Sequence, residues 1–177
     1  MNMIAVLDVH YSDNGSARAA AVILEDLNDI EPKEVLYSEV DSVADYEPGS
    51  FYKRELPVLF KLFREHNIHP DTIVIDGLVH LPDRSDALGM HLYNNLKSIY
   101  PTEKYKHLKI FGIAKNGFQG FDSYYKAYRH SIKPLIVTTT DFDIGISEAV
   151  SLVKSLPGKY RLPEIVKLAD HACRGML

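Results

Sequence analysis

The chain has a single cysteine, Cys173, among its 177 residues. One cysteine can form neither a disulfide within the chain nor a zinc site built from several thiolates. No apolar run approaches the roughly 20 residues that are needed to span a bilayer. The first residues lack a basic region, and their apolar run already contains Asp8, so we expect no secretory signal. These absences together predict a cytoplasmic protein.

Net positive charge is missing as well, because 24 acidic residues outnumber 20 basic ones and leave a formal net charge of −4. Nucleic-acid-binding domains are usually basic, so the total argues mildly against that class. The charges are unevenly distributed, however, with acidic residues gathered in residues 25–47 and basic ones in residues 97–133. The second segment is either a local basic face or an ordinary solvated surface.

What is present is typical of one globular domain. Hydrophobic residues make up 46% of the chain and charged residues 25%. The length suits a single domain over residues 1–177, without an internal repeat. Short apolar segments rich in branched residues predict strands at residues 3–10, 17–24, 34–40, 72–75, 108–114 and 135–139.

Apolar residues at helical spacing predict helices between and after these strands. One begins at a cap on Ser50 and contains Pro57, one begins at Ser85 or Asp86, and two more cover residues 146–156 and 163–173. Residues 115–134 form an irregular segment rich in aromatic side chains. These side chains either stack on nucleic-acid bases or pack over the core, and we favour packing.

The order of elements predicts an α/β fold. The first three strands form an antiparallel meander because their connections are short. The later strands are joined through helices, which favours parallel pairing and a mixed sheet with helices on both faces. This is the ribonuclease-H-like order, and it places residues 3–10 beside residues 72–75.

Three carboxylates fall at informative points of this fold. Asp8 and Asp76 each end an apolar strand, and Glu55 lies near the start of the first helix. Adjacent strand ends direct oxygen ligands at one point, which is what Mg²⁺ or Mn²⁺ requires. A loop-capping role for either aspartate, and a surface ion pair of Glu55 with Arg54, are the structural alternatives. We interpret the three together as a metal-dependent site that cuts phosphodiester bonds.

Five segments resemble, in order, the motifs of endonuclease V, a family of repair nucleases of ribonuclease-H-like fold. They are residues 8–11, 46–55, 74–77, 112–115, and 160–164 followed by 169–170. Residues 46–55 are similar to the family's wedge and glutamate, and residues 112–115 to its Gly-Val-Ala-Lys motif. The resemblance covers nearly the whole chain and implies one endonuclease V-like domain.

The resemblance implies a Mg²⁺- or Mn²⁺-dependent endonuclease that hydrolyses a phosphodiester bond near deaminated adenine (inosine) in DNA or RNA. It implies that Asp8, Glu55, Asp76 and Asp170 hold the metal. These four residues and Lys115, close to the scissile phosphate, would form the catalytic set. A solvated ion pair of Asp170 on its helix, and a merely exposed Lys115, are the alternatives.

A substrate-binding set is also implied, for nucleic acid that is single-stranded or contains an extruded base. Tyr46 and Pro48 match the wedge that separates strands, although Tyr46 could instead pack against the sheet. Gly49, Phe51 and Gly77 match positions around the pocket for the base.

Two segments depart from the family pattern. The family's histidines after Asp-Gly are replaced in residues 78–84, where His80 is the nearest counterpart, and residues 141–145 carry two acids in place of Gly-His-Arg. His80 and His171 are the histidines that we expect nearest to the aspartates. The departures leave two other functions open: a nucleic-acid binder without activity, and a hydrolase of small phosphorylated nucleotides.

Overall fold

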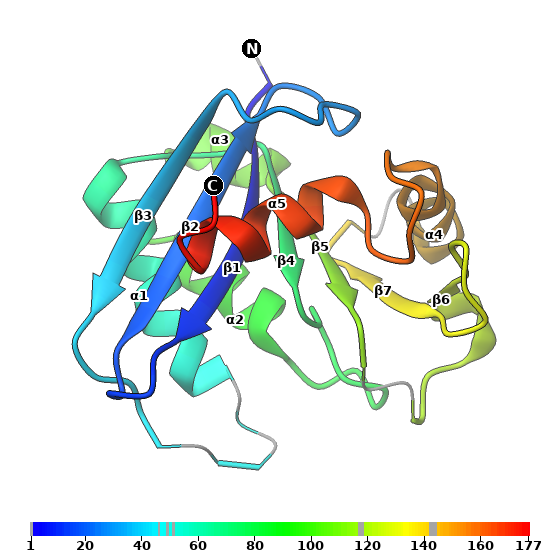
Figure 1. The fold of residues 1–177 in the computed structure, drawn as a ribbon, viewed down its shortest axis with the longest axis horizontal. Helices are drawn as coiled ribbons and strands as arrows, with labels where there is room; N and C mark the ends of the chain where they lie inside the picture. Colours follow the sequence, from blue (N-terminus) through cyan, green and yellow to red (C-terminus); the bar gives the residue numbers. More distant parts are fainter. Residues whose placement is uncertain (1, 46, 49, 51, 117–118, 142–144) are drawn as a thin grey trace.

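The computed structural model describes residues 2–45, 47–48, 50, 52–116, 119–141 and 145–177. Figure 1 shows a twisted central sheet with helices on both of its faces. Within these residues the sheet has seven strands in the order β3-β2-β1-β4-β5-β7-β6. The strands are β1 Ile4–Tyr11, β2 Ala17–Leu24, β3 Glu34–Val40, β4 Thr72–Asp76, β5 Lys109–Ala114, β6 Lys126–Ala127 and β7 Leu135–Thr139.

The first three strands form an antiparallel meander. The turn between β1 and β2 contains Gly15 at φ +85°, a left-handed conformation that favours glycine. β1 then pairs in parallel with β4, and β4 with β5, because helices between them return the chain to the same end of the sheet. The predicted ribonuclease-H-like mixed sheet is therefore confirmed, with the first and fourth strands adjacent.

The far end of the sheet is antiparallel. β7 pairs antiparallel with β5 on one side and with β6 on the other. In the described part of residues 115–134 no α-helix separates β5 from β7, so the chain returns without a crossover. This segment was predicted to be irregular, and it contains β6 and the short 3₁₀ helix η1 Ser123–Tyr125. Two residues of strand pairing are too short to show a period in the sequence.

The core has two halves, one on each face of the sheet. The side chains of Ile4, Val6 and Val74 belong to the half that packs against α4 and α5, whereas Ala5 and Leu7 belong to the other half. The helices are α1 Tyr52–His66, α2 Leu88–Leu96 and α3 Thr102–His107 on one face, and α4 Gly145–Ser155 and α5 Glu164–Cys173 on the other. No helix of the described residues is long and apolar enough to cross a membrane.

The first helix tolerates its proline. α1 begins at Tyr52, two residues after the predicted cap, and continues through Pro57 to His66. Pro57 lies in the second turn, where its missing N–H removes a single backbone hydrogen bond. The fully buried Val58, Leu59 and Leu62 hold the helix on the sheet.

The second helix begins later than predicted, at Leu88 rather than at Ser85 or Asp86. Asp83 Oδ1 accepts hydrogen bonds from both the backbone N–H and the hydroxyl of Ser85, which makes a tight turn. Asp86 then forms a β-bridge with His80. The polar residues that we interpreted as a helix cap therefore close a turn instead, since the same side chains favour both structures.

The basic segment 97–133 does not form one continuous face. Arg129 is only 3% exposed, and its guanidinium donates to the carbonyl oxygens of Val153, Lys154 and Leu156 at the C-terminal end of α4. Lys106 forms an ion pair with Glu103 at 2.7 Å. Neither alternative for this segment, a basic face or a solvated surface, applies to Arg129, because its charge caps a helix from inside the fold.

The aromatic residues of the same segment divide into two groups. Phe121 and Tyr125 are buried and pack with Ala114 and Ile136 in a small separate cluster, as the packing alternative predicted. Tyr124 and Tyr128 are exposed. Phe118 lies outside the described residues.

Candidate metal centre and substrate pocket

Asp8 and Asp76 lie at the matching ends of two parallel neighbours. The β1–β4 register runs through the pair Leu7–Ile75, and each aspartate is the next residue on its strand. Strand side chains alternate between the faces, so both carboxylates lie on the face of Val6 and Val74, which α5 covers. The topology therefore brings together two acids that are 68 residues apart in the sequence.

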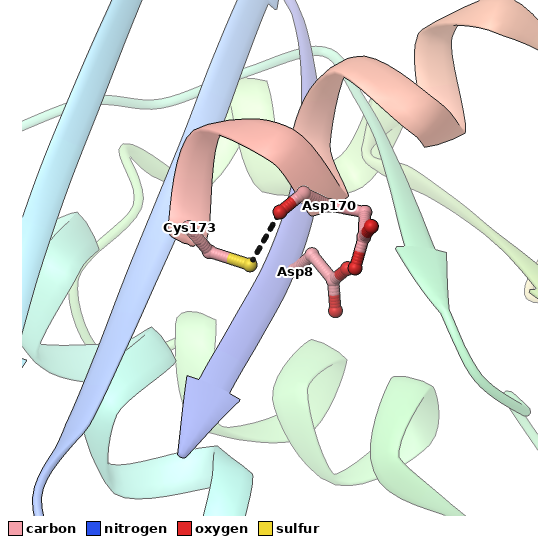
Figure 2. Close-up of side chains that lie close together, drawn as sticks. All are labelled: Asp8, Asp170 and Cys173. Atoms are coloured by element: carbon pink, nitrogen blue, oxygen red, sulfur yellow. Dashed lines mark hydrogen bonds between the residues drawn. The ribbon is translucent and has the colours of Figure 1, made fainter. Parts of the chain in front are cut away.

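A third carboxylate comes from the helix above them. Figure 2 shows Asp170 of α5 with its carboxyl group directed toward that of Asp8, and the thiol of Cys173 beside them. One ligand atom from each of these three residues lies within 4.8 Å of the others. Asp170 Oδ1 also accepts a hydrogen bond from Arg174 Nε at 2.9 Å, and Cys173 Sγ donates to the Asp170 carbonyl at 3.2 Å.

The fourth carboxylate, Glu55, arrives from the opposite face of the sheet. It lies in the first turn of α1, where the positive end of the helix dipole favours an acid. Its neighbour Arg54 stacks over the Tyr11 ring, 4.4 Å from the ring centre. Burial and the Glu55 charge raise the pKa of Tyr11, so its phenol stays protonated beside the carboxylate.

The acids disturb one another's protonation. Burial first, and then the Asp76 charge, raise the pKa of Asp8 to about 7. Burial, followed by the charges of Asp8 and Asp76, raises the pKa of Glu55 to about 7. The pKa of Asp76 is raised by burial, against the opposing effect of Lys115. Uncompensated carboxylates crowd this site, which is the situation that a bound cation relieves.

Lys115 is one of two cations that line the pocket, the other being Arg174. Lys115 follows directly after β5, and its Nζ lies 3.1 Å from Asp76 Oδ2. Burial alone lowers the pKa of Lys115, but the charges of Asp76, Asp8 and Asp170 outweigh that effect and raise it. One ammonium group is therefore held charged among four acids.

Gly112 explains how β5 approaches the strand ends. A Cβ at this position would lie 2.5 Å from the Gly77 carbonyl oxygen and 2.6 Å from Thr138 Oγ1. The same Thr138 hydroxyl accepts a hydrogen bond from the Val79 N–H at 2.9 Å. Only glycine lets the segment after Asp76 cross β5 this closely.

The carboxylates and Lys115 line one pocket of about 690 Å³. Apolar side chains also line it, among them Val9, Tyr52, Leu78, Leu81 and Leu88. Such a cavity suits a ligand with a flat apolar part and an anionic part. Four oxygen donors with a charged lysine fit Mg²⁺ or Mn²⁺, which take carboxylates together with substrate phosphate.

Comparison with known proteins identifies the relatives of this arrangement. The family model for Endonuclease V matches residues 1–92, more than half of the chain. The chain belongs to the Endonuclease V family. Endonuclease V of Azotobacter vinelandii is 27% identical over 182 residues, which cover 96% of this chain and 81% of that protein. Membership therefore rests on the N-terminal half, and similarity extends over nearly all of the chain.

Solved Endonuclease V structures share the fold. That of Streptomyces avermitilis has 25% identity and a TM-score of 0.75, covering 99% of this chain and 81% of that one. A Ciona intestinalis Endonuclease V variant, in complex with a 23mer DNA containing an inosine followed by a ribo-adenosine, has 17% identity and a TM-score of 0.70. This match covers 98% of this chain and 84% of the Ciona chain, and at 17% identity it shows only that the two share a fold.

The structure brings together most of the residues that the sequence singled out. Asp8, Glu55, Asp76, Lys115 and Asp170 all line the pocket, as does Gly77. Their roles in an Endonuclease V reaction stay predictions.

Of the other predicted substrate-binding residues, the structure describes only Pro48. Pro48 is exposed and is not among the described residues that line the pocket. Tyr46, Gly49 and Phe51 lie outside the described residues.

Neither expected histidine is among the described residues that line the pocket. His80 Nδ1 lies 2.8 Å from the Leu81 carbonyl oxygen, and its ring contacts Tyr125 edge-on at 5.5 Å. His171 is partly buried on α5. The β-bridge to Asp86 directs the segment after Val79 so that Leu81, and not the histidine, reaches the pocket.

Sequence reasoning missed several residues of the pocket. Tyr52, Asp86, Asn116 and Arg174 line it and were not among the predicted site residues. Arg174 had a usable signal, since it lies four residues after Asp170 and so on the same side of the helix. Tyr52 and Asp86 had none, because tertiary packing alone brings them to the pocket.

Proposed function

We propose that this chain is a metal-dependent endonuclease that hydrolyses a phosphodiester bond near a deaminated base, inosine, in DNA or RNA. One observation carries the proposal: four carboxylates from β1, α1, β4 and α5 line one pocket with Lys115, in a member of the Endonuclease V family. The inosine-containing DNA in the Ciona complex supports the substrate class. Residues 1–177 would act as one such domain in nucleic-acid repair.

The metal ligands in this proposal are Asp8, Glu55, Asp76 and Asp170. The site passes a simple test of fit, because burial and mutual repulsion raise the pKa of three of these acids and a cation would reverse the effect. When bound, Mg²⁺ or Mn²⁺ supplies positive charge for the transferring phosphate and makes water a stronger acid.

The protein's own groups complete the chemistry. Lys115 bridges the acids and the open pocket, so its ammonium can exchange Asp76 for a phosphate oxygen and offset the charge that develops there. Asp8 and Glu55 hold oxygens that can accept a proton from water.

The apolar wall of the pocket holds the base. Tyr52, Leu78 and Leu88 line the same cavity as the acids, and Gly77 provides backbone without a side chain. Extruding a base costs a few kcal/mol, which contact with such a wall offsets. Tyr46, Pro48, Gly49 and Phe51 keep their proposed roles as wedge and pocket rim.

The direct test incubates the protein with single-stranded DNA and RNA that contain inosine, with Mg²⁺ and with chelator. The wild type is compared with Asp76→Asn and with Asp41→Asn, an exposed aspartate outside the pocket that serves as the matched control. We expect cutting only with metal, its loss in Asp76→Asn, and full activity in Asp41→Asn. Cutting in chelator, or by Asp76→Asn at the wild-type rate, would contradict the metal mechanism.

The same experiment separates the two other functions. Binding without cutting would indicate the inactive nucleic-acid binder. Hydrolysis of inosine nucleotides, with intact oligonucleotides, would indicate the small-molecule hydrolase, for which a pocket of about 690 Å³ is large enough.

A further inference from the structure

A second feature that fits nucleic acid lies outside the pocket, in the loop before α5. The side chain of Tyr160 is 56% exposed. Two ammonium groups lie over its ring: Lys159 Nζ at 5.4 Å and Lys167 Nζ at 4.9 Å from the ring centre. Neither lysine has a carboxylate within 4.0 Å among the described residues. We call Lys159, Tyr160 and Lys167 the tyrosine–lysine patch.

The patch is connected to the Lys115 side of the pocket. Arg161, the next residue after Tyr160, donates hydrogen bonds to the carbonyl oxygens of Lys115 and of Pro134, the latter at 2.8 Å. Lys167 lies three residues before Asp170, so both project from the same side of α5. Figure 1 shows the loop before α5 next to the end of the sheet formed by β5 and β7. The patch therefore lies about one helical turn from Asp170, and its loop is attached to the segment that carries Lys115.

The chemistry of the patch indicates what that molecule is. Exposed aromatic rings combined with unpaired ammonium groups suit a ligand with planar bases and regularly spaced negative charges. The ring also holds the two ammonium groups in place, which reduces the entropy lost when they bind phosphate. The chain as a whole is acidic, with a net charge of −4, so this local positive charge is not a general property of its surface.

We propose that the tyrosine–lysine patch binds the single-stranded nucleic acid that leads away from the pocket, with the two lysines on phosphates and Tyr160 against a base. The inference rests on the proposed function for the direction of the strand. A single strand is required, because a base within a duplex does not expose its flat face to Tyr160.

The test measures binding to inosine-containing single strands by fluorescence anisotropy, with Ca²⁺ in place of Mg²⁺ and the oligonucleotide checked to be intact. For a long strand, we expect Lys159→Gln/Lys167→Gln to weaken binding about tenfold at low salt. The double variant should also lower the dependence of log K on log salt by about 0.7 for each lost phosphate contact. Tyr160→Ala should weaken binding about tenfold and Tyr160→Phe hardly at all, because the ring is kept.

A matched control and a short strand make the result specific. Lys97→Gln removes an exposed lysine that follows α2 on the opposite face, and it should leave the affinity unchanged. A short oligonucleotide that fills only the pocket should bind all variants alike. Equal affinity of the double variant and the wild type for the long strand would overturn the proposal. So would an equal loss on the short strand, or displacement of the strand by polyglutamate of the same charge.

Failure of this inference can be told apart from failure of the proposed function. If the wild type does not cut any oligonucleotide, the endonuclease proposal fails, yet the binding measurements still decide whether the patch holds a strand. If the short oligonucleotide is cut and the variants bind the long strand as the wild type does, the endonuclease proposal stands and the patch is excluded.

Discussion

Two lysine–aspartate pairs lie at opposite ends of β5, and they differ in their surroundings. At the start of the strand, Lys109 Nζ lies 2.9 Å from Asp141 Oδ2, and just after its end Lys115 Nζ lies 3.1 Å from Asp76 Oδ2. The Asp141 side chain is 5% exposed and that of Asp76 is 18% exposed. The two pairs have nearly the same geometry and the same residue types, so geometry alone does not separate structural from chemical roles.

The neighbours of each pair make the difference. The backbone N–H of Asp141 also donates a hydrogen bond to Thr139 Oγ1 at 2.9 Å, in a turn that closes the end of β7. Asp76 instead shares its pocket with Asp8, Glu55, Asp86 and Asp170, against which Lys115 and Arg174 supply only two positive charges. One lysine balances a carboxylate, whereas the other leaves several carboxylates uncompensated and open to a cavity. Excess charge of one sign beside a cavity is therefore the better indicator of a reactive site.

The largest expected effect separates the two aspartates. Asp76→Asn should lower the rate of cutting by at least about 10³-fold, since it removes a proposed metal ligand. Its thermal midpoint in chelator should equal or exceed that of the wild type, because the substitution also removes repulsion. Asp141→Asn should keep the activity within about twofold and lose roughly 1–2 kcal/mol of unfolding free energy. Single-turnover cleavage and thermal melts check both; a reversed pattern would refute the comparison.

The two lysines should differ in the same way as their aspartates: substitution of Lys115 should lower activity and substitution of Lys109 should lower stability, with smaller effects. Lys115→Gln removes the cation proposed to face the phosphate and should slow cutting about 10²-fold. Lys109→Gln should leave the rate unchanged and cost about 1 kcal/mol, because its side chain is half exposed and Asp141 keeps other contacts. Cleavage rates at saturating oligonucleotide and denaturant titrations test this pair. A wild-type rate in Lys115→Gln would assign that lysine a structural role.

The acids of the pocket were predictable because strand ends have a definite geometry. Asp8 and Asp76 each follow a run of buried apolar residues, and the predicted meander occupies one edge of β1 and leaves the other free for β4. Glu55 was predicted as a third ligand from the neighbouring helix, whereas Asp170 needed the family resemblance, because its spacing to Arg174 equally suits a surface ion pair.

Contacts between distant segments were not predictable. Arg129 binds carbonyl groups 24 to 27 residues later in the chain, and Arg161 binds the carbonyl of Lys115, 46 residues earlier. Backbone carbonyls carry no sequence signal, so the partners of these arginines cannot be identified from the sequence. The predicted helix start at Ser85 or Asp86 was wrong for a related reason: the same polar residues that begin helices also close turns, as Asp83 and Ser85 do here.

A third prediction concerns how stability depends on pH, and it involves only the carboxylates of the pocket, at the Lys115 end of β5. Asp8 and Glu55 have pKa values raised to about 7 in the folded protein, above those of the unfolded chain. Their ionisation therefore opposes folding, so the metal-free protein should lose stability as the pH rises from about 4 to about 7. Asp8→Asn/Glu55→Gln should flatten this loss, and excess Mg²⁺ should reverse it in the wild type.

Thermal melts across this pH range, with chelator and with Mg²⁺, provide the measurement. Asp41→Asn serves again as the control and should follow the wild type. A metal-free protein that becomes more stable between pH 4 and pH 7, with the double variant behaving alike, would show that the acids are compensated within the protein.

The smallest expected effect concerns Arg174, the second cation that lines the pocket. It pairs with Asp170 through a contact that is about half exposed on the arginine side, so solvent screens the pair and its contribution to stability is small. Its positive charge nevertheless opposes a cation at the same carboxylate. Arg174→Gln should therefore raise the affinity for Mg²⁺ about threefold with little change in stability. Isothermal titration of the metal decides the sign, and weaker binding would mean that Arg174 orients Asp170 instead of competing for it.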